Sequence, residues 1–85
     1  MKIKRGIVAQ KLGNIFVAYD NDAGVLFEFN EVGFEIFRKL EKGKKKRETV
    51  KSLTNKFSVS PKEAARDYEL FIKDLAKRGL IKDRK

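Results

Sequence analysis

The sequence predicts a single α+β domain in which a three-stranded antiparallel sheet is followed by three helices. Short runs of β-branched and apolar residues fill the first third of the chain, apolar residues at helical spacing fill the rest, and no repeat or low-complexity tract interrupts them. The 85 residues leave room for one domain, residues 1–85, because independently folding domains are mostly about 50 to 200 residues long. A hydrophobic content of 41% is enough for one modest core.

The first two strands are expected at residues 7–12 and 15–19. The pair Gly13-Asn14 between them is a hairpin signal, because both residue types tolerate the positive φ that a two-residue turn requires. Such a turn places Leu12 opposite Ile15 and sets the register of the whole hairpin.

The third strand is expected at residues 25–29, after a turn cluster at residues 21–24. Phe27 and Phe29 share one face of this strand, but both faces of the predicted sheet carry apolar side chains, so alternation does not tell which face the helices cover. Because this strand ends the meander, one of its edges is expected to be free unless the N-terminal segment or a second molecule covers it. A free edge presents unpaired N–H and C=O groups that an extended peptide can satisfy.

Three helices follow, and capping residues mark their ends. Asn30 is a good N-cap for the first helix and Gly43 follows its end, while Ser60 and Gly79 bracket the third. The second helix begins within the basic run 44–47. Apolar residues recur at helical spacing within the three segments: Val32, Ile36, Phe37, Leu40; Val50, Leu53, Phe57; Ala64, Tyr68, Phe71, Ile72, Leu75.

The composition excludes most enzyme chemistry. The chain has no cysteine and no histidine, so disulfides, zinc-finger ligation, thiol nucleophiles and Ser-His-Asp triads are ruled out, and no Gly-rich phosphate loop is present.

The longest apolar stretch, residues 15–19, is too short to cross a membrane. We therefore expect a soluble, cytoplasmic, non-catalytic protein without a cofactor, and the net charge of +9 favours an anionic partner.

One flank of the third helix carries Leu70 between two carboxylates, Asp67 and Asp74, outside the core-facing stripe. This flank could form the wall of a groove for a peptide with one apolar anchor and a Lys or Arg. Alternatively, Leu70 is a lone exposed leucine and the carboxylates pair with neighbouring cations of the same helix.

Apolar residues and glycines recur at a characteristic joint spacing from about Lys4 to Ile81. They are Phe29-Asn30, Gly33, Ile36, Leu40, Gly43, Val50, Leu53, Phe57, Asp67-Tyr68, Phe71-Ile72, Leu75 and Gly79-Leu80-Ile81. In this spacing the chain resembles the PqqD-like family, whose founding member serves pyrroloquinoline quinone (PQQ) biosynthesis.

The resemblance implies a winged-helix-like peptide-binding domain, the recognition element for ribosomally synthesised and post-translationally modified peptides. In that family the leader segment of a precursor peptide adds a strand to the third strand and rests against the third helix, while a partner, often a radical S-adenosylmethionine (SAM) enzyme, modifies the peptide. We expect the peptide-binding residues here to be Val25, Leu26, Phe27, Glu28, Phe29, Asp67, Leu70, Phe71 and Asp74. The free edge allows either a monomer or a strand-swapped dimer.

Two other functions stay open at the sequence level, a winged-helix nucleic-acid binder and a scaffold that only docks the modifying enzyme. A basic run between Arg38 and Lys51 could hold phosphates, steer an acidic leader or meet an acidic face of the enzyme, or it could simply be solvated. The third helix argues against nucleic acid, because the acids Glu63, Asp67, Glu69 and Asp74 would repel phosphates.

Overall fold

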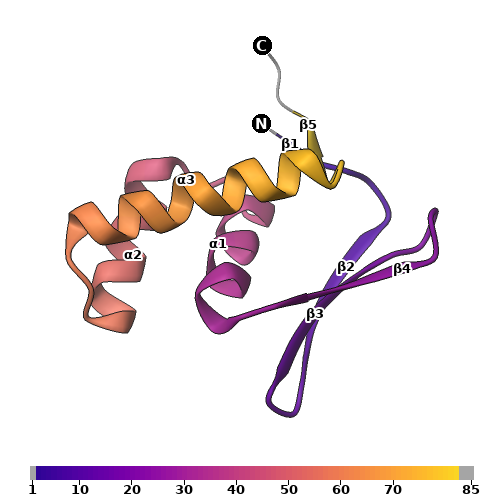
Figure 1. The fold of residues 1–85 in the computed structure, drawn as a ribbon, viewed down its shortest axis with the longest axis horizontal. Helices are drawn as coiled ribbons and strands as arrows, with labels where there is room; N and C mark the ends of the chain where they lie inside the picture. The colour runs from indigo at the N-terminus through magenta and orange to yellow at the C-terminus, as the bar shows by residue number, and fades with distance from the viewer. Residues whose placement is uncertain (1, 83–85) are drawn as a thin grey trace.

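A computed structural model describes residues 2–82, and it confirms the α+β fold. Three antiparallel strands in the order β2-β3-β4 precede three helices, and α3 runs across α1 and α2 (Figure 1). The bounds are β2 Ile7–Leu12, β3 Ile15–Asp20, β4 Val25–Phe29, α1 Glu31–Glu41, α2 Lys46–Phe57 and α3 Pro61–Lys77.

The register of the first hairpin is the predicted one. Leu12 pairs with Ile15 across the turn, and the ladder continues to Ile7 opposite Asp20. Gly13 adopts φ 63°, the positive value that a two-residue hairpin turn demands.

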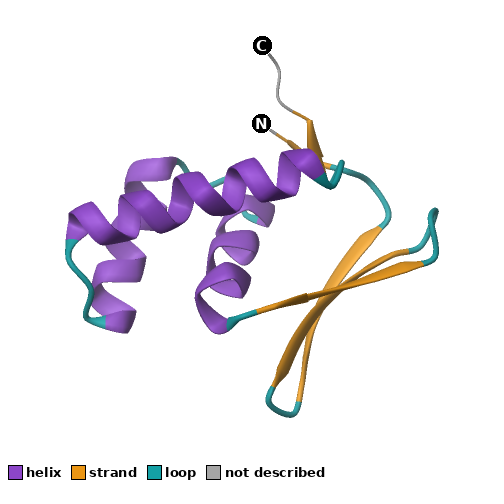
Figure 2. Cartoon of the chain, viewed as in Figure 1, coloured by secondary structure: helices purple, strands orange, loops and turns teal. Residues whose placement is uncertain are grey.

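A second, two-stranded sheet was not predicted. β1 (Lys2–Ile3) pairs antiparallel with β5 (Ile81–Lys82), beside the C-terminal end of α3 (Figure 2). Strands of two residues leave no alternation to detect, so the sequence carried no signal for them. The N-terminal segment is thus paired with the segment after α3 and does not cover the edge of β4.

α1 and α3 begin at the predicted capping residues, and α2 begins within the basic run as expected. Asn30 Oδ1 accepts a hydrogen bond from the Gly33 N–H at 2.7 Å, and Ser60 Oγ accepts one from the Glu63 N–H at 3.1 Å. These bonds satisfy N–H groups that the first turn of a helix leaves without partners. Gly79 has φ 75° just after α3, which turns the chain back so that the segment after α3 can pack on the core.

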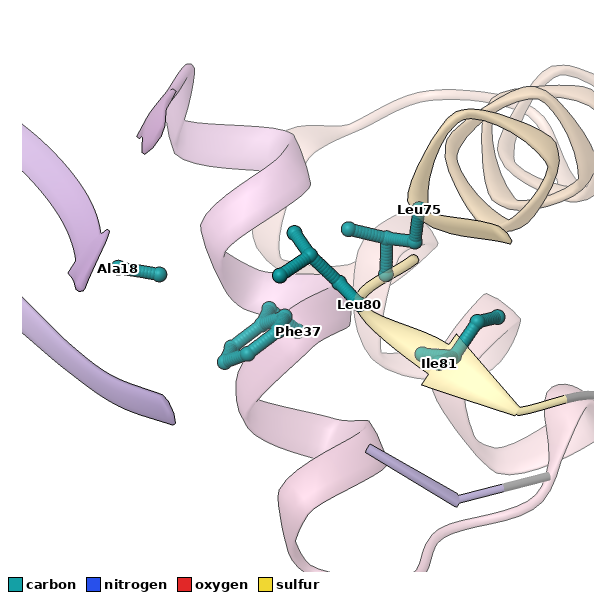
Figure 3. Packing of buried hydrophobic residues seen from close by; sticks show 5 residues of the cluster. All are labelled: Ala18, Phe37, Leu75, Leu80 and Ile81. Atoms are coloured by element: carbon teal, nitrogen blue, oxygen red, sulfur yellow. The ribbon is translucent and has the colours of Figure 1, made fainter. Parts of the chain in front are cut away.

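The core consists of two clusters that share partly buried neighbours. In the first, Ala18 of β3 points toward Phe37 of α1, with Leu75 of α3 and the returning Leu80 and Ile81 packed around it (Figure 3). The second joins the three helices through Ile36, Leu53, Ala64 and Tyr68. Leu40, Phe71 and Ile72 pack against both clusters.

The structure decides which face of the sheet is covered. Phe27 and Phe29 pack against the first cluster, whereas Leu26 and its cross-strand partner Tyr19 are exposed on the other face. Among residues 2–82, no helix has the length and apolar character needed to cross a membrane.

Candidate functional site

The outer edge of β4 is open. β4 pairs with β3 from Phe16 opposite Phe29 to Asp20 opposite Val25, and no other strand within residues 2–82 pairs with it. The main-chain groups on this edge are therefore available to an extended peptide.

A groove lies where β4 ends, between the start of α1 and the middle of α3. Its volume is about 330 Å³. The four residues predicted on α3 all line it: Asp67, Leu70, Phe71 and Asp74. The opposite wall consists of Asn30, Val32, Gly33 and Ile36.

Phe71 joins this groove to β4. Its ring meets the ring of Phe29 edge-on, with the centroids 5.4 Å apart. Gly33 makes room for it, because a Cβ at Gly33 would lie 2.8 Å from Phe71 Cε1. The last residue of the open strand and the apolar lining of the groove thus form one continuous surface.

The two carboxylates of the groove differ in their surroundings. Asp74 Oδ2 accepts a hydrogen bond from Arg78 Nε at 3.0 Å, so the expected local pairing occurs there. The Arg78 guanidinium in turn lies over the Phe27 ring, 5.6 Å from its centroid. Asp67 has no ion-pair partner among the described residues, and it is the carboxylate available to a cation of a guest.

Leu70 lies between these carboxylates with 59% of its surface exposed. Because it lines the groove beside Phe71, it is not an isolated surface leucine. An apolar side chain of a guest could bury Leu70 without displacing any part of the protein.

None of the five predicted residues of β4 lines the groove itself, and their side chains divide between the two faces of the sheet. Phe27 and Phe29 point toward the helices, whereas Leu26 and Glu28 alternate to the opposite face, across from Tyr19 and Val17. The side chains of Leu26 and Glu28 are therefore placed beside an added strand on the outer face of the sheet, not in the groove next to α3.

Sequence reasoning missed the wall that α1 contributes. Asn30 was assigned to capping and Val32 and Ile36 to the core, which explained them without any role in a groove. Gly33 carried a signal, since glycine inside a helix costs about 1 kcal/mol relative to alanine and is usually present for a close approach.

Comparisons with known proteins identify the family. The family model described as Coenzyme PQQ synthesis protein D (PqqD) matches residues 16–81. No curated protein matches the sequence.

Two solved structures are similar to this chain over nearly its whole length. The structure described as TbiB1 in complex with the TbiA(beta) leader peptide has a TM-score of 0.86 and 28% identity, covering 100% of this chain and 99% of that one. The lasso peptide synthetase B1 complexed with the leader peptide has a TM-score of 0.81 and 20% identity, covering 93% of each chain, and this likeness concerns the fold. Since the family model spans most of the described residues, the chain belongs to the PqqD family.

Proposed function

We propose that this protein is a non-catalytic peptide-binding module that captures the leader segment of a ribosomally synthesised precursor peptide and presents it to a modifying enzyme. The observation that carries the proposal is the open edge of β4, which continues into the groove between α1 and α3. Membership of the PqqD family supports it, as does the similarity to TbiB1, which was solved with a leader peptide. The partner we propose is a radical SAM enzyme in the cytoplasm.

The leader would pair with Val25–Phe29 as an added strand, with its alternate side chains directed toward α3. A sub-micromolar complex needs more than about 8 kcal/mol. Pairing with a five-residue strand contributes a few hydrogen bonds of about 1 kcal/mol each. Apolar anchoring between Leu70, Phe71 and Val32 must therefore contribute much of the remainder, at about 1.5 to 3 kcal/mol per buried side chain.

The groove favours a leader with one apolar anchor and a nearby Lys or Arg. The anchor would contact Leu70 and Phe71, and the cation would pair with Asp67. Residues 1–85 would act as one domain, a proposal supported by the neighbours that the two core clusters share.

The test is calorimetric titration of the full chain with the N-terminal segments of the short peptides encoded next to its gene. We expect one segment to bind with one-to-one stoichiometry and sub-micromolar affinity, and the neighbouring modifying enzyme to act on that precursor faster when the chain is present. Failure of every segment to bind, or turnover that does not change when the chain is added, would contradict the proposal.

The nucleic-acid alternative receives no support from the comparisons. α3, the helix that a winged helix would insert into a DNA groove, carries Asp67 and Asp74. These carboxylates would face the phosphate backbone and repel it.

A further inference from the structure

The groove between α1 and α3, which we call the leader groove, has no Lys or Arg in its lining, and most of the net positive charge lies elsewhere. Residues 38–56 contain nine Lys or Arg and two Glu, so this stretch carries +7 of the net +9. Lys46 and Arg47 stand in the first turn of α2, where positive charge opposes the helix dipole. Lys46 also pairs with Glu69 of α3, so part of this charge links the helices, and the question is what the remaining cations bind.

Part of this charge surrounds a second hollow of about 290 Å³, which we call the basic pocket. It lies between β2, β3, α1 and the end of α2, and its lining includes Lys11, Phe16, Phe34, Arg38, Lys42 and Lys56. Five cationic and two acidic side chains line it, so its lining carries a net charge of +3. α1 separates the two sites, because Gly33 and Ile36 face the leader groove while Phe34 and Arg38 face the basic pocket.

Two aromatic rings form the apolar part of the basic pocket. Phe16 of β3 and Phe34 of α1 lie with their centroids 5.0 Å apart and their planes tilted by 41°. Lys11 Nζ lies 5.7 Å from the centroid of Phe16, and Arg38 Cζ lies 5.3 Å from that of Phe34. Contact with the rings thus holds both cations at the pocket.

The carboxylates of the protein neutralise only part of this charge. Glu35 pairs with Lys56 at 3.2 Å and with Lys39 at 3.4 Å, and it accepts a hydrogen bond from Ser52 Oγ at 3.1 Å. Burial raises the pKa of Glu35, but the bonds from Lys56 and Ser52 and the two lysine charges outweigh burial and hold the pKa below its ordinary value. Glu35 therefore stays ionised and paired, and Arg38 pairs with Glu41 at 3.2 Å. Lys11 and Lys42 have no ion-pair partner within residues 2–82.

We infer that the basic pocket is a second binding site, which takes an acidic segment of a partner protein in which carboxylates flank an apolar side chain. The apolar side chain would contact Phe16 and Phe34, and the carboxylates would pair with Lys11 and Lys42. The site does not depend on leader binding, because the leader groove lies on the other side of α1. One domain could hold a leader and an acidic partner at the same time.

The lining favours a protein over a nucleic acid. A short acidic segment can place its few carboxylates at Lys11 and Lys42, away from Glu31 and Glu35. A nucleic acid carries a charge on every phosphate, so its backbone would also face these two carboxylates.

The test is NMR titration of the full, isotopically labelled chain with a short capped peptide in which Glu and Asp flank one Leu. We expect saturable shifts at Phe16, Phe34 and Arg38. Lys42→Glu should weaken binding about tenfold, since it replaces an attraction with a repulsion. The matched control is Lys62→Glu, the same charge change at an exposed position on α3, which should change affinity less than about twofold.

Three results would overturn the inference. Equal losses in Lys42→Glu and Lys62→Glu would mean attraction to net charge without a site. Equal binding of the Gln and Asn version of the peptide would remove the role of the carboxylates, and tighter binding of a single-stranded oligonucleotide would make nucleic acid the occupant. The variant Leu70→Asp lies in the leader groove and should bind the acidic peptide as the natural chain does. This separates the test of the basic pocket from the test of leader binding.

Discussion

Gly33 and Phe71 show how one residue can shape the leader groove. A glycine inside a helix normally costs stability, yet at this position any Cβ would collide with the Phe71 ring. Phe71 also packs edge-on against Phe29, so a shift of its ring would reach β4. Gly33 therefore sets both the depth of the groove and its connection to the open strand.

We predict that Gly33→Ala lowers the free energy of unfolding by about 1 kcal/mol. Overpacking costs about 1 to 3 kcal/mol, and the better helix propensity of alanine offsets about 1 kcal/mol of this. Urea denaturation measures the difference. The double variant Gly33→Ala/Phe71→Leu should recover part of the loss, and an alanine variant more stable than the natural chain would refute the close contact.

Leu70 is the residue at which leader binding should be most sensitive. Leu70→Asp places a charge where an apolar anchor must be buried, and we expect it to weaken the leader complex at least about tenfold. Lys45→Glu should have a smaller effect although it changes the net charge more, because Lys45 contributes its main-chain N–H to Glu48 and its side chain is exposed. Calorimetric titration with the leader compares the affinities of the two variants. A loss of affinity in Lys45→Glu as large as that in Leu70→Asp would indicate an electrostatic site.

The Asp20 carboxylate makes stability depend on pH on the acid side. Lys4 Nζ donates to Asp20 Oδ2 at 2.8 Å, and the N–H groups of Asp22 and Ala23 donate to Oδ1. The bond from Lys4 is the main cause that holds the pKa of Asp20 below its ordinary value of 3.8, while burial acts in the opposite direction. Since the pKa is lowered on folding, the contribution to stability is complete above 3.8 and is lost as the pH falls through the pKa of the folded state.

Asp20→Asn should therefore be less stable than the natural chain at neutral pH and should lose less stability on acidification. Urea denaturation at a series of pH values from neutral to about 3 measures this. Lys62→Gln, which also changes the charge by one unit at an exposed position on α3 but removes no carboxylate, serves as the control and should keep the natural acid dependence. Parallel acid profiles for Asp20→Asn and the natural chain would contradict the role of this carboxylate.

Among the elements, β4 and β2 are both edge strands, and the sheet order alone does not distinguish them. β4 differs because its end meets the groove between α1 and α3, so that a guest can gain main-chain pairing and apolar burial together. β2 offers pairing without such a groove beside α3. Because of this difference, we expect an extended peptide to pair with β4 and not with β2.

Amide hydrogen exchange separates the two edges. On adding the leader, we expect exchange to slow at the outward-facing amides of β4, because these N–H groups become hydrogen-bonded. β2 is the internal control and should exchange as before. Slower exchange along β2, with exchange in β4 unchanged, would place the peptide at the edge of β2 and contradict strand addition at β4.

At the scale of the whole molecule, charge is divided between two sides. The leader groove carries Asp67 and Asp74, whereas the stretch 38–56 carries +7 and contributes to the basic pocket. The leader complex should depend mainly on main-chain pairing and apolar contact. The complex with an acidic peptide should depend on ion pairs, which salt screens.

We predict that raising the salt concentration from about 0.05 M to about 0.5 M changes leader affinity less than about threefold and weakens the acidic peptide more than about tenfold. Calorimetry of both ligands with the same preparation measures this contrast. A leader complex that salt weakens as strongly as the acidic peptide would show that the groove works through charge, contrary to its apolar lining.

The sequence alone determined the three strands of the main sheet, the three helices and the candidate flank of α3. The Gly13-Asn14 turn set the hairpin register, and Asn30 and Ser60 marked helix starts. The spacing of Asp67, Leu70 and Asp74 placed them on one flank of the third helix. These inferences were possible because turns, caps and helical periodicity are local properties of the chain. Only the tertiary structure decided which sheet face is covered, that β1 pairs with β5, that α1 supplies the second wall of the groove, and that Leu26 and Glu28 point away from it. Periodicity states which side chains share a face, but what packs against that face depends on contacts between segments distant in sequence, and no local pattern records them.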